Sequence, residues 1–441
     1  MIAMQNITSV ISSVALLLSL SSIKTSQSLS FSPGIANRAI HILEEASSQN
    51  IPVDAALRRF TKYQERSYVN SDEYKLISDV LRNIAISQYR IDWQLGAAGV
   101  ECSPENRVAF LKKGNPLECK GMDLQTTLEC PDWAWNGLKE AFPDEEDLSK
   151  ELRALMEPAP LDLRVNTLKC EERIEALRDI ISAGYDATST PWSPIGIRLE
   201  ERTALGRVPG LLDGIVEPQD EGSQLVASLL QAQPGETVAD YCAGSGGKTL
   251  QIAASMKNKG RLYSMDVSEA RLERGKPRCK KAGVSNVQRQ VVQEDMSRKD
   301  KWLKRRKGTF DRVLVDAPCS GVGSWRRKPD ARRTWGTFDD GFDDGSDRLA
   351  NLLPLQQQIL QRASRLVKVG GRLVYVTCSL LPQENEKQIL QFLESDVGAG
   401  WQVESPPSDF AIPFEVEGKF LRLTPAQHNT DGFFAAILTK T

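Results

Sequence analysis

The first third of the chain carries a helical pattern of apolar residues. Over residues 36–93 the apolar positions recur close to the 3.6-residue period of a helix, and no strand-like alternation interrupts them. Residues 96–132 contain three prolines and predict loops, whereas residues 131–156 again show one apolar helix face. The pattern therefore predicts an all-helical domain with an irregular linker over residues 34–157.

A different pattern begins at the two prolines of residues 158–160. The segment LDLRVNTLK, residues 161–169, predicts a strand, and one helix and two short strands follow it before residue 222. From Ser223 to the end of the chain, strand and helix patterns alternate regularly. We therefore expect a small α+β module over residues 158–222 and then, over residues 223–441, a Rossmann-like α/β domain: a mostly parallel sheet with helices on both faces.

Two short cysteine motifs follow buried-strand patterns in the α/β region. DAPCSG comes directly after the apolar run FDRVLV, and TCS comes directly after RLVYV. Ligands and catalytic groups gather at the carboxyl ends of strands in open α/β sheets. The sequence therefore predicts that Cys319 and Cys378 face one pocket, with Asp316 beside them, where they act on a bound substrate.

A glycine-rich turn, AGSGG, follows the predicted strand that ends near Ala239. Such a turn lets the backbone approach a ligand closely. Taken alone it fits a phosphate loop, an NAD loop or an S-adenosylmethionine loop, but the patterns of the first two are missing. Acidic residues also close successive strands: Asp266, a candidate partner for ribose hydroxyls, then Asp295 and Asp316.

Composition narrows the choice of partners and cofactors. The 441 residues carry a net charge of −2, so nucleic-acid binding would depend on local basic patches, such as residues 299–307 and the arginines that follow Cys319. The same patches could be no more than solvated surface. Eight cysteines without a CxxC pair, and only two histidines, predict no metal site and a reducing compartment.

The N-terminus predicts a targeting segment. Residues 1–23 carry no charge, and the apolar run of residues 10–20 is short for a membrane span. The segment SLSFSP resembles the import junction of secondary plastids. We expect residues 1–33 to be a targeting segment for an organelle, the plastid being favoured over the mitochondrion, and the mature protein to be a monomer without a membrane association. A misassigned start codon is the alternative.

Taken together, the motifs resemble the RsmB/Nop/Sun family of RNA cytosine-5 methyltransferases. The matching segments are LDLRVNTLK, DYCAGSGGKT, LYSMDVSEARLER, QED, VLVDAPCSGVGSWRRKPD, GGRLVYVTCSLLPQENE and PAQHNTDGFFAAIL, which span residues 161–438 in the family's order. The helical N-terminal region is similar to the NusB-like RNA-binding domain of bacterial members. One departure is AGSGG, where most members read APGG.

The resemblance implies a class I methyltransferase fold, S-adenosylmethionine as cofactor and RNA, ribosomal RNA above all, as partner. Cys378 would be the nucleophile that adds to carbon 6 of a cytosine, Cys319 would assist release of the adduct, and Asp316 would hold the base. Asp266 would bind the cofactor's ribose and Asp295 its adenine side. The cofactor's remaining contacts would come from Cys242, Ala243, Gly244, Ser245, Gly246, Gly247, Lys248 and Arg271.

Three alternatives remain open at this point. A DNA cytosine methyltransferase would use Cys319 as the nucleophile, although the TCS motif and LDLRVNTLK favour RNA. A catalytically silent RNA-binding assembly factor would have no need of both cysteines and the acids. Transfer RNA could replace ribosomal RNA as the substrate, and the NusB-like pattern favours ribosomal RNA.

Overall fold

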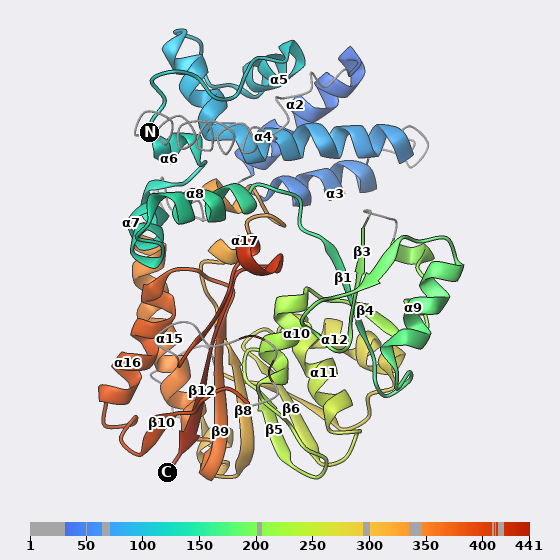
Figure 1. Cartoon of the computed structure of the whole chain (residues 1–441), viewed down its shortest axis with the longest axis vertical. Coiled ribbons are helices and arrows are strands. Elements are labelled where there is room, and N and C mark those ends of the chain that lie inside the picture. The colour runs from blue at the N-terminus through green and yellow to red at the C-terminus, as the bar shows by residue number, and fades with distance from the viewer. Residues whose placement is uncertain are drawn as a thin grey trace, which may run out of the picture. The chain divides into compact units, whose positions relative to one another are not determined.

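The computed structural model describes residues 31–49, 51–63, 71–200, 205–293, 300–334, 346–407, 410, 412 and 419–441 (Figure 1). The chain forms two compact units, one of residues 1–131 with 329–341 and the other of residues 132–328 with 342–441. Residues 132–157, which we expected in the helical domain, therefore group with the second unit. A short segment downstream of the first cysteine motif instead belongs to the first.

The first unit is helical, as its periodicity predicts. Its helices are α2 (Pro33–Ser48), α3 (Val53–Tyr63), α4 (Ser71–Ala97), α5 (Pro104–Lys113), α6 (Leu124–Thr127) and α14 (Ala331–Thr334). The apolar stripes of α2, α3, α4 and α5 form one core that includes Ile42, Ile77 and Ile84. The expected loop-rich stretch thus contains a ten-residue helix, α5, which Ser103 caps and Gly114 ends in the left-handed conformation.

Helix α4 is interrupted at Ser87, whose φ of −115° and ψ of 17° are not helical. The carboxylate of Glu129 accepts hydrogen bonds from the backbone N–H groups of Tyr89 and Arg90, at 2.8 and 3.0 Å, and from Nε of Arg90 at 2.9 Å. Glu129 is fully buried. The buried carboxylate therefore supplies the acceptors that a regular helix would supply at the interruption.

The expected targeting segment falls almost wholly outside the described residues. Its last three residues are an exception: Phe31 is buried in the helical core, the Oγ of Ser32 accepts from the backbone N–H of Ile35, and Pro33 begins α2. Residues 31–33 are therefore part of the helical unit and not of a separate segment. In the described part of the chain, no helix is both long and apolar enough to span a bilayer. The compartment stays a prediction.

The second unit begins with two helices, α7 (Asp132–Ala141) and α8 (Glu145–Ala154), and a small antiparallel sheet. The strand order of that sheet is β2-β3-β1-β4, and α9 packs against it. The elements are β1 (Leu161–Val165), α9 (Arg173–Ser182), β2 (Ala187–Ser189), β3 (Gly196–Leu199) and β4 (Val216–Pro218). The predicted α+β module is present, with β2 as an additional strand.

The large sheet has the strand order β10-β12-β9-β8-β5-β6-β7, and β11 pairs with β12. Strands β5 to β9 run parallel, whereas β12 is antiparallel to β9. The elements are β5 (Thr237–Asp240), β6 (Arg261–Asp266), β7 (Val287–Val291), β8 (Phe310–Asp316), β9 (Val367–Thr377), β10 (Trp401–Val403), β11 (Leu421–Leu423) and β12 (Phe433–Lys440). This is the predicted class I Rossmann-like sheet, and its strand order reverses between β5 and β8, where ligands of such sheets bind.

Helices cover both faces of the large sheet. Helices α15 and α16 pack with Val313, Val315 and Tyr375 on one face, and α10 and α11 pack with Leu314 and Val374 on the other. The helices of this region are α10 (Glu221–Ser228), α11 (Gly247–Ser255), α12 (Glu269–Ala282), α13 (Lys301–Arg305), α15 (Ser346–Ser364), α16 (Glu386–Glu394) and α17 (Pro425–His428). All of them except α13 are labelled in Figure 1.

Candidate active site

The two predicted cysteines lie side by side. Strands β8 and β9 are parallel neighbours, and the motifs at their carboxyl ends bring the Sγ atoms of Cys319 and Cys378 to 3.4 Å from each other. Both side chains are partly exposed. The turns that follow the strands thus present two thiols at one edge of the sheet, as the sequence predicts.

Glu384, which sequence reasoning did not single out, fastens the two cysteine turns together. Its buried carboxylate accepts from the backbone N–H and the hydroxyl of Ser320 and from Nε2 of Gln356. Ser320 in turn lies 3.2 Å, Oγ to Oγ, from Ser379. The Glu384 carboxyl thus bridges the residues that follow Cys319 and Cys378. Its position six residues after Cys378, in the segment PQENE, is the sequence signal that could have found it.

Asn385 stabilises the turn around Cys378 through two hydrogen bonds of its side chain. Its Oδ1 accepts from the hydroxyl of Thr377 at 2.5 Å, and its Nδ2 donates to the carbonyl of Ser379 at 2.9 Å. The carbonyl of Cys378 accepts from the N–H of Gly323 at 3.0 Å, which ties this turn to the loop that follows Cys319. The backbone around the thiols is therefore fixed by buried hydrogen bonds.

Lys248 and Asp316 form an ion pair next to the thiols, with Nζ and Oδ2 at 2.7 Å. Burial lowers the pKa of Lys248, but Asp316 and then Cys378 and Asp240 favour its charged form, and the net effect is a raised pKa. The lysine is therefore an ammonium ion at neutral pH. It sits between the glycine-rich turn and the carboxylate at the end of β8.

The surroundings of Cys319 and Cys242 favour the protonated form of both thiols. The hydrogen bond to Cys378, burial and the negative charge that Cys378 can carry raise the pKa of Cys319 well above its usual value. Burial and the nearby Asp316, Asp266 and Asp240 do the same for Cys242. Cys319 and Cys242 are therefore thiols at neutral pH.

The glycine-rich turn forms the loop between β5 and α11. Gly244 and Gly246 have φ values of 56° and 86°, a left-handed conformation that side chains disfavour. A Cβ on Gly244 would meet no atom within 4 Å, so the space in front of the loop is open. Ala243 is anchored through its N–H to the carbonyl of Met265, and Gly247 and Lys248 begin α11. The backbone thus leaves room for a ligand at the end of β5.

Two carboxylates lie beside this loop, and one of them, Asp266, is a predicted site residue. Asp266, nearly buried at the end of β6, accepts from the N–H groups of Gly244 and Ser268 and lies 3.8 Å from the guanidinium of Arg271. Asp240, at the end of β5, was not predicted as a site residue, although it is a further acid at a strand end. It is fully buried, it accepts from the hydroxyl of Thr249, and its Oδ1 has no hydrogen-bond partner in the structure.

One predicted site residue, Asp295, lies outside the described residues. The site residues that the structure does describe gather at the carboxyl ends of β5, β6, β8 and β9. An open glycine loop, a helix N-terminus and buried carboxylates are a donor set that suits a nucleoside-containing cofactor such as S-adenosylmethionine.

Most of the arginines after Cys319 are buried or paired with acids, which corrects our expectation of a basic surface patch there. Arg333 is the exception in exposure, because its side chain is 38% exposed, and it pairs with Asp92 at 2.9 Å. Arg326 is 3% exposed and bonds Asp431 through Nε at 2.9 Å, and Arg327 bonds Asp431 and Asp220 at 2.6 Å each. Arg332 is 2% exposed within the first unit. Counting charges along the sequence could not show this, because the acids that pair with Arg326 and Arg327 lie about 100 positions away.

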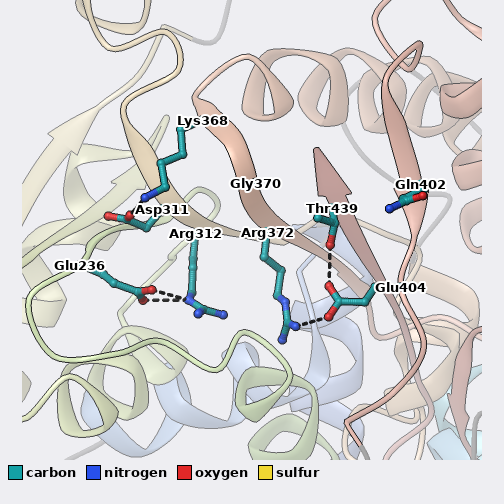
Figure 2. Close-up of a pocket in the computed structure, with 9 residues that line it drawn as sticks. All are labelled: Glu236, Asp311, Arg312, Lys368, Gly370, Arg372, Gln402, Glu404 and Thr439. Atoms are coloured by element: carbon teal, nitrogen blue, oxygen red, sulfur yellow. Dashed lines mark hydrogen bonds and ion pairs between the residues drawn. The ribbon is translucent and has the colours of Figure 1, made fainter. Parts of the chain in front are cut away.

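A polar pocket lies at the opposite edge of the sheet, and neither cysteine lines it. It lies at the amino ends of β5, β8 and β9, and its charges pair with one another (Figure 2). Arg312 bonds Glu236 at 2.8 Å, Lys368 pairs with Asp311, and Arg372 pairs with Glu404. These ion pairs connect the amino ends of the strands. The candidate catalytic residues lie at the opposite, carboxyl edge of the sheet.

Comparison with known proteins agrees with this fold and site. The family model described as 16S rRNA methyltransferase RsmB/F matches residues 227–439, and the ferredoxin-like domain of RsmF/B-like methyltransferases matches residues 130–205. The chain is 34% identical over 332 residues to the probable ribosomal RNA small subunit methyltransferase B of Synechocystis sp., covering 74% of this chain and 70% of the relative. It is 35% identical to the ribosomal RNA small subunit methyltransferase B of Pasteurella multocida, covering 75% and 69%.

Solved structures show the same fold. The crystal structure of PH0851 superposes with a TM-score of 0.75 at 26% identity, covering 93% of this chain and all of that one. A methyltransferase homolog from Pyrococcus horikoshii gives a TM-score of 0.59 at 28% identity, covering 72% and 97%. S-adenosylmethionine is the methyl donor of RsmB/F methyltransferases. With two family domains in order and relatives matched over more than two thirds of their length, the chain belongs to the RsmB/F family of rRNA methyltransferases.

Proposed function

We propose that this chain methylates carbon 5 of a cytosine in ribosomal RNA through a covalent adduct to Cys378. The observation that carries the proposal is the 3.4 Å separation of the Cys319 and Cys378 Sγ atoms at the carboxyl ends of neighbouring strands. Carbon 5 of cytosine is a poor nucleophile, and covalent addition divides one difficult step into two easier ones. Two adjacent thiols allow one to add and the other to assist release.

Cys378 begins the reaction as a thiolate. Its sulfur forms a bond to carbon 6 of the cytosine, and the electron pair of the carbon 5–carbon 6 double bond moves toward the ring nitrogen N3. Carbon 5 thereby becomes nucleophilic enough to accept a methyl group. S-adenosylmethionine, when bound, would supply that methyl group as an electrophile and would leave as S-adenosylhomocysteine. The base must leave any stack to reach the thiols, so the enzyme acts on single-stranded or extruded cytosine.

Asp316 and Lys248 would hold the base and stabilise its developing charge. The carboxyl of Asp316 ends β8, three residues before Cys319, and can accept from the exocyclic amine or share a proton with N3. Lys248, 2.7 Å from Asp316, supplies a fixed positive charge beside the ring. Charges fixed before the reaction stabilise the added state without a cost of reorganisation.

Cys319 serves the release step. The hydrogen bond to Cys378, burial and the charge of Cys378 raise the pKa of Cys319, and this charge is absent while Cys378 is bonded to carbon 6. Cys319 then loses its proton to solvent water more readily, and its thiolate can take the hydrogen from carbon 5 as a proton, which returns Cys319 to the thiol form. The electron pair left behind reforms the double bond and expels Cys378. Loss of Cys319 would therefore allow addition and methylation but leave the protein attached to RNA.

The cofactor would be held by residues of three loops. Residues 242–248 would receive the methionine end, Asp266 with Arg271 the ribose, and Asp295 the adenine side. The open space at Gly244 and the unpartnered Oδ1 of Asp240 support this placement.

Ribosomal RNA is proposed as the substrate because relatives that match about three quarters of the chain are named for the small-subunit ribosomal RNA. A NusB-like RNA-binding role for the helical first unit would fit that substrate. Transfer RNA stays the second candidate among RNAs.

The product tests this proposal. Protein lacking the first 30 residues is incubated with methyl-labelled S-adenosylmethionine and, separately, with small-subunit ribosomal RNA, transfer RNA and DNA. The nucleic acid is then digested to nucleosides. Labelled 5-methylcytidine from ribosomal RNA supports the proposal. Label in another nucleoside, or only in transfer RNA or DNA, would overturn the assigned product or substrate. No label with any nucleic acid, despite intact RNA binding, would favour a silent assembly factor.

A further inference from the structure

Helix α12 lies directly against the glycine-rich loop between β5 and α11. A Cβ on Gly275 would come within 3.4 Å of the carbonyl oxygen of Ser245, so helix and loop are in close contact at this point. One turn further along, Arg278 reaches the same loop residue. Its NH1 donates to the carbonyl oxygen of Ser245 at 2.9 Å and to the Ser245 hydroxyl at 3.1 Å.

The other side of the Arg278 guanidinium is fixed by the small sheet. Its Nε and NH2 lie 2.9 and 2.8 Å from Oε1 of Glu217, a residue of β4 that is 7% exposed. Lys281, one turn later on α12, also pairs with this carboxylate at 3.4 Å. The planar guanidinium is therefore held on both sides, which a flexible lysine could not reproduce.

The loop residue that Arg278 contacts is flanked by two glycines. Ser245 stands between Gly244 and Gly246, both in the left-handed region, and glycines give the unbound loop much conformational freedom. Ordering such a loop at the moment of binding lowers affinity, whereas a loop ordered beforehand binds without that loss. Two hydrogen bonds from NH1 of Arg278 to Ser245 restrict the loop to the conformation that the structure shows.

We propose that Arg278 is a positioning residue for S-adenosylmethionine: braced by Glu217, it pre-orders the Gly244–Gly246 turn and so sets cofactor affinity. The inference rests on the proposed binding of the cofactor at this loop. Arg278 does not touch the thiols, so its effect falls on cofactor binding and not on the chemical step. It also makes the small antiparallel sheet, which contains β4, part of the support of the cofactor site.

The test compares variants by calorimetric titration with S-adenosylhomocysteine, which reads binding without turnover. Arg278→Met should raise the dissociation constant about 10-fold or more, since hydrogen bonds to a charged group are lost. Glu217→Gln should raise the dissociation constant by a smaller factor than Arg278→Met. The double variant should raise it by less than the product of the two single factors, because the two residues act through one contact. Arg278→Lys should recover little. Lys276→Met, on the same helix but paired with Glu273 away from the loop, is the matched control and should bind like the wild type.

Activity then separates positioning from catalysis. With Arg278→Met, KM for S-adenosylmethionine should rise while kcat at saturating cofactor stays within about 2-fold, as expected for lost ground-state binding. A folded Arg278→Met protein with an unchanged dissociation constant would overturn the proposal. Gly244→Val reports on the site itself: if it abolishes binding while Arg278→Met does not, the site is right and the clamp is wrong. A wild-type protein that does not bind the cofactor would overturn both.

Discussion

The carboxylate of Glu384 accepts a hydrogen bond of 2.7 Å from the backbone N–H of Ser320. The contact joins the segment that follows one candidate catalytic cysteine to the residue that directly follows the other. It spans 64 positions of sequence and is buried. The 3.4 Å separation of the thiols thus depends on a carboxyl group that takes no part in the chemistry itself.

Replacing this carboxylate should loosen the thiol pair. Glu384→Gln presents an amide N–H₂ to donors that need an acceptor, so we expect the free energy of unfolding to fall by about 1–3 kcal/mol. We also expect kcat to fall more than KM changes, because the relative position of the cysteines matters in the chemical steps. Thermal unfolding and steady-state kinetics measure both effects. Glu394→Gln, an exposed position at the end of α16, is the control; equal effects of the two variants would contradict the bridging role.

The ion pair of Lys248 and Asp316 should matter for addition to the base. Lys248→Met removes the cation that lies 2.7 Å from Asp316 and beside Cys378, and we expect kcat at saturating substrates to fall by about 10-fold or more. Lys259→Met, at an exposed position after α11, should keep full activity. If Lys248→Met keeps wild-type kcat, the lysine is a structural partner of Asp316 only.

Asp240 should make the stability of the protein depend on pH. Burial raises its pKa to about 7 from an ordinary 3.8, in spite of the hydrogen bond from Thr249. The folded state therefore binds this proton more tightly than the unfolded state does, so ionisation between about pH 4 and pH 7 destabilises the fold. Asp240→Asn stays neutral, and its stability relative to the wild type should improve across this window by on the order of 2–4 kcal/mol.

Unfolding temperatures of the wild type and Asp240→Asn, measured from pH 4 to pH 8, check this prediction. Other titrating groups cancel in the difference between the two proteins. Asp396→Asn, an exposed position, should show no such trend. A difference between the wild type and Asp240→Asn that does not change with pH would mean that Asp240 is already ionised in the fold at low pH.

Arg326 should support the fold and not bind RNA. It is 3% exposed and paired with Asp431, and removal of one member of a buried pair costs about 3–5 kcal/mol. Arg326→Met should therefore lower the unfolding temperature but leave the slope of RNA affinity against salt unchanged, because that slope counts contacts with phosphates. Lys304→Met, exposed on α13, provides the comparison. If a folded Arg326→Met protein shows a smaller slope of RNA affinity against salt, Arg326 contacts RNA phosphates and the prediction is wrong.

Local sequence patterns were enough to predict most of the fold and several residues of the candidate site. The periods of α2 to α4 and the strand–helix alternation after residue 223 predicted the helical unit and the Rossmann-like sheet, because burial on one or two faces leaves a readable period. Cys319, Cys378, Asp266 and Asp316 could be placed because each lies at the end of a buried strand or within three residues after it. What decided these placements was the position of a residue at a strand end.

Contacts between distant segments were not predictable in this way. Glu384 and Ser320 lie 64 positions apart, and Arg278 meets Ser245 across 33 positions, so no local pattern connects them. The short strands β10 and β11 carry too few residues to show an alternation. The burial of Arg326 and Arg327 likewise depends on Asp431 and Asp220, which only the folded chain brings near.

A denaturing gel tests the central claim most directly. Cys319→Ala protein without the first 30 residues is incubated with S-adenosylmethionine and small-subunit ribosomal RNA and then separated under denaturing conditions. The account predicts a slowly migrating, RNase-sensitive band that disappears when Cys378 is also replaced by alanine. Absence of the band together with loss of activity in Cys319→Ala, while Cys378→Ala still forms an adduct, would make Cys319 the nucleophile and contradict the roles proposed for the two thiols.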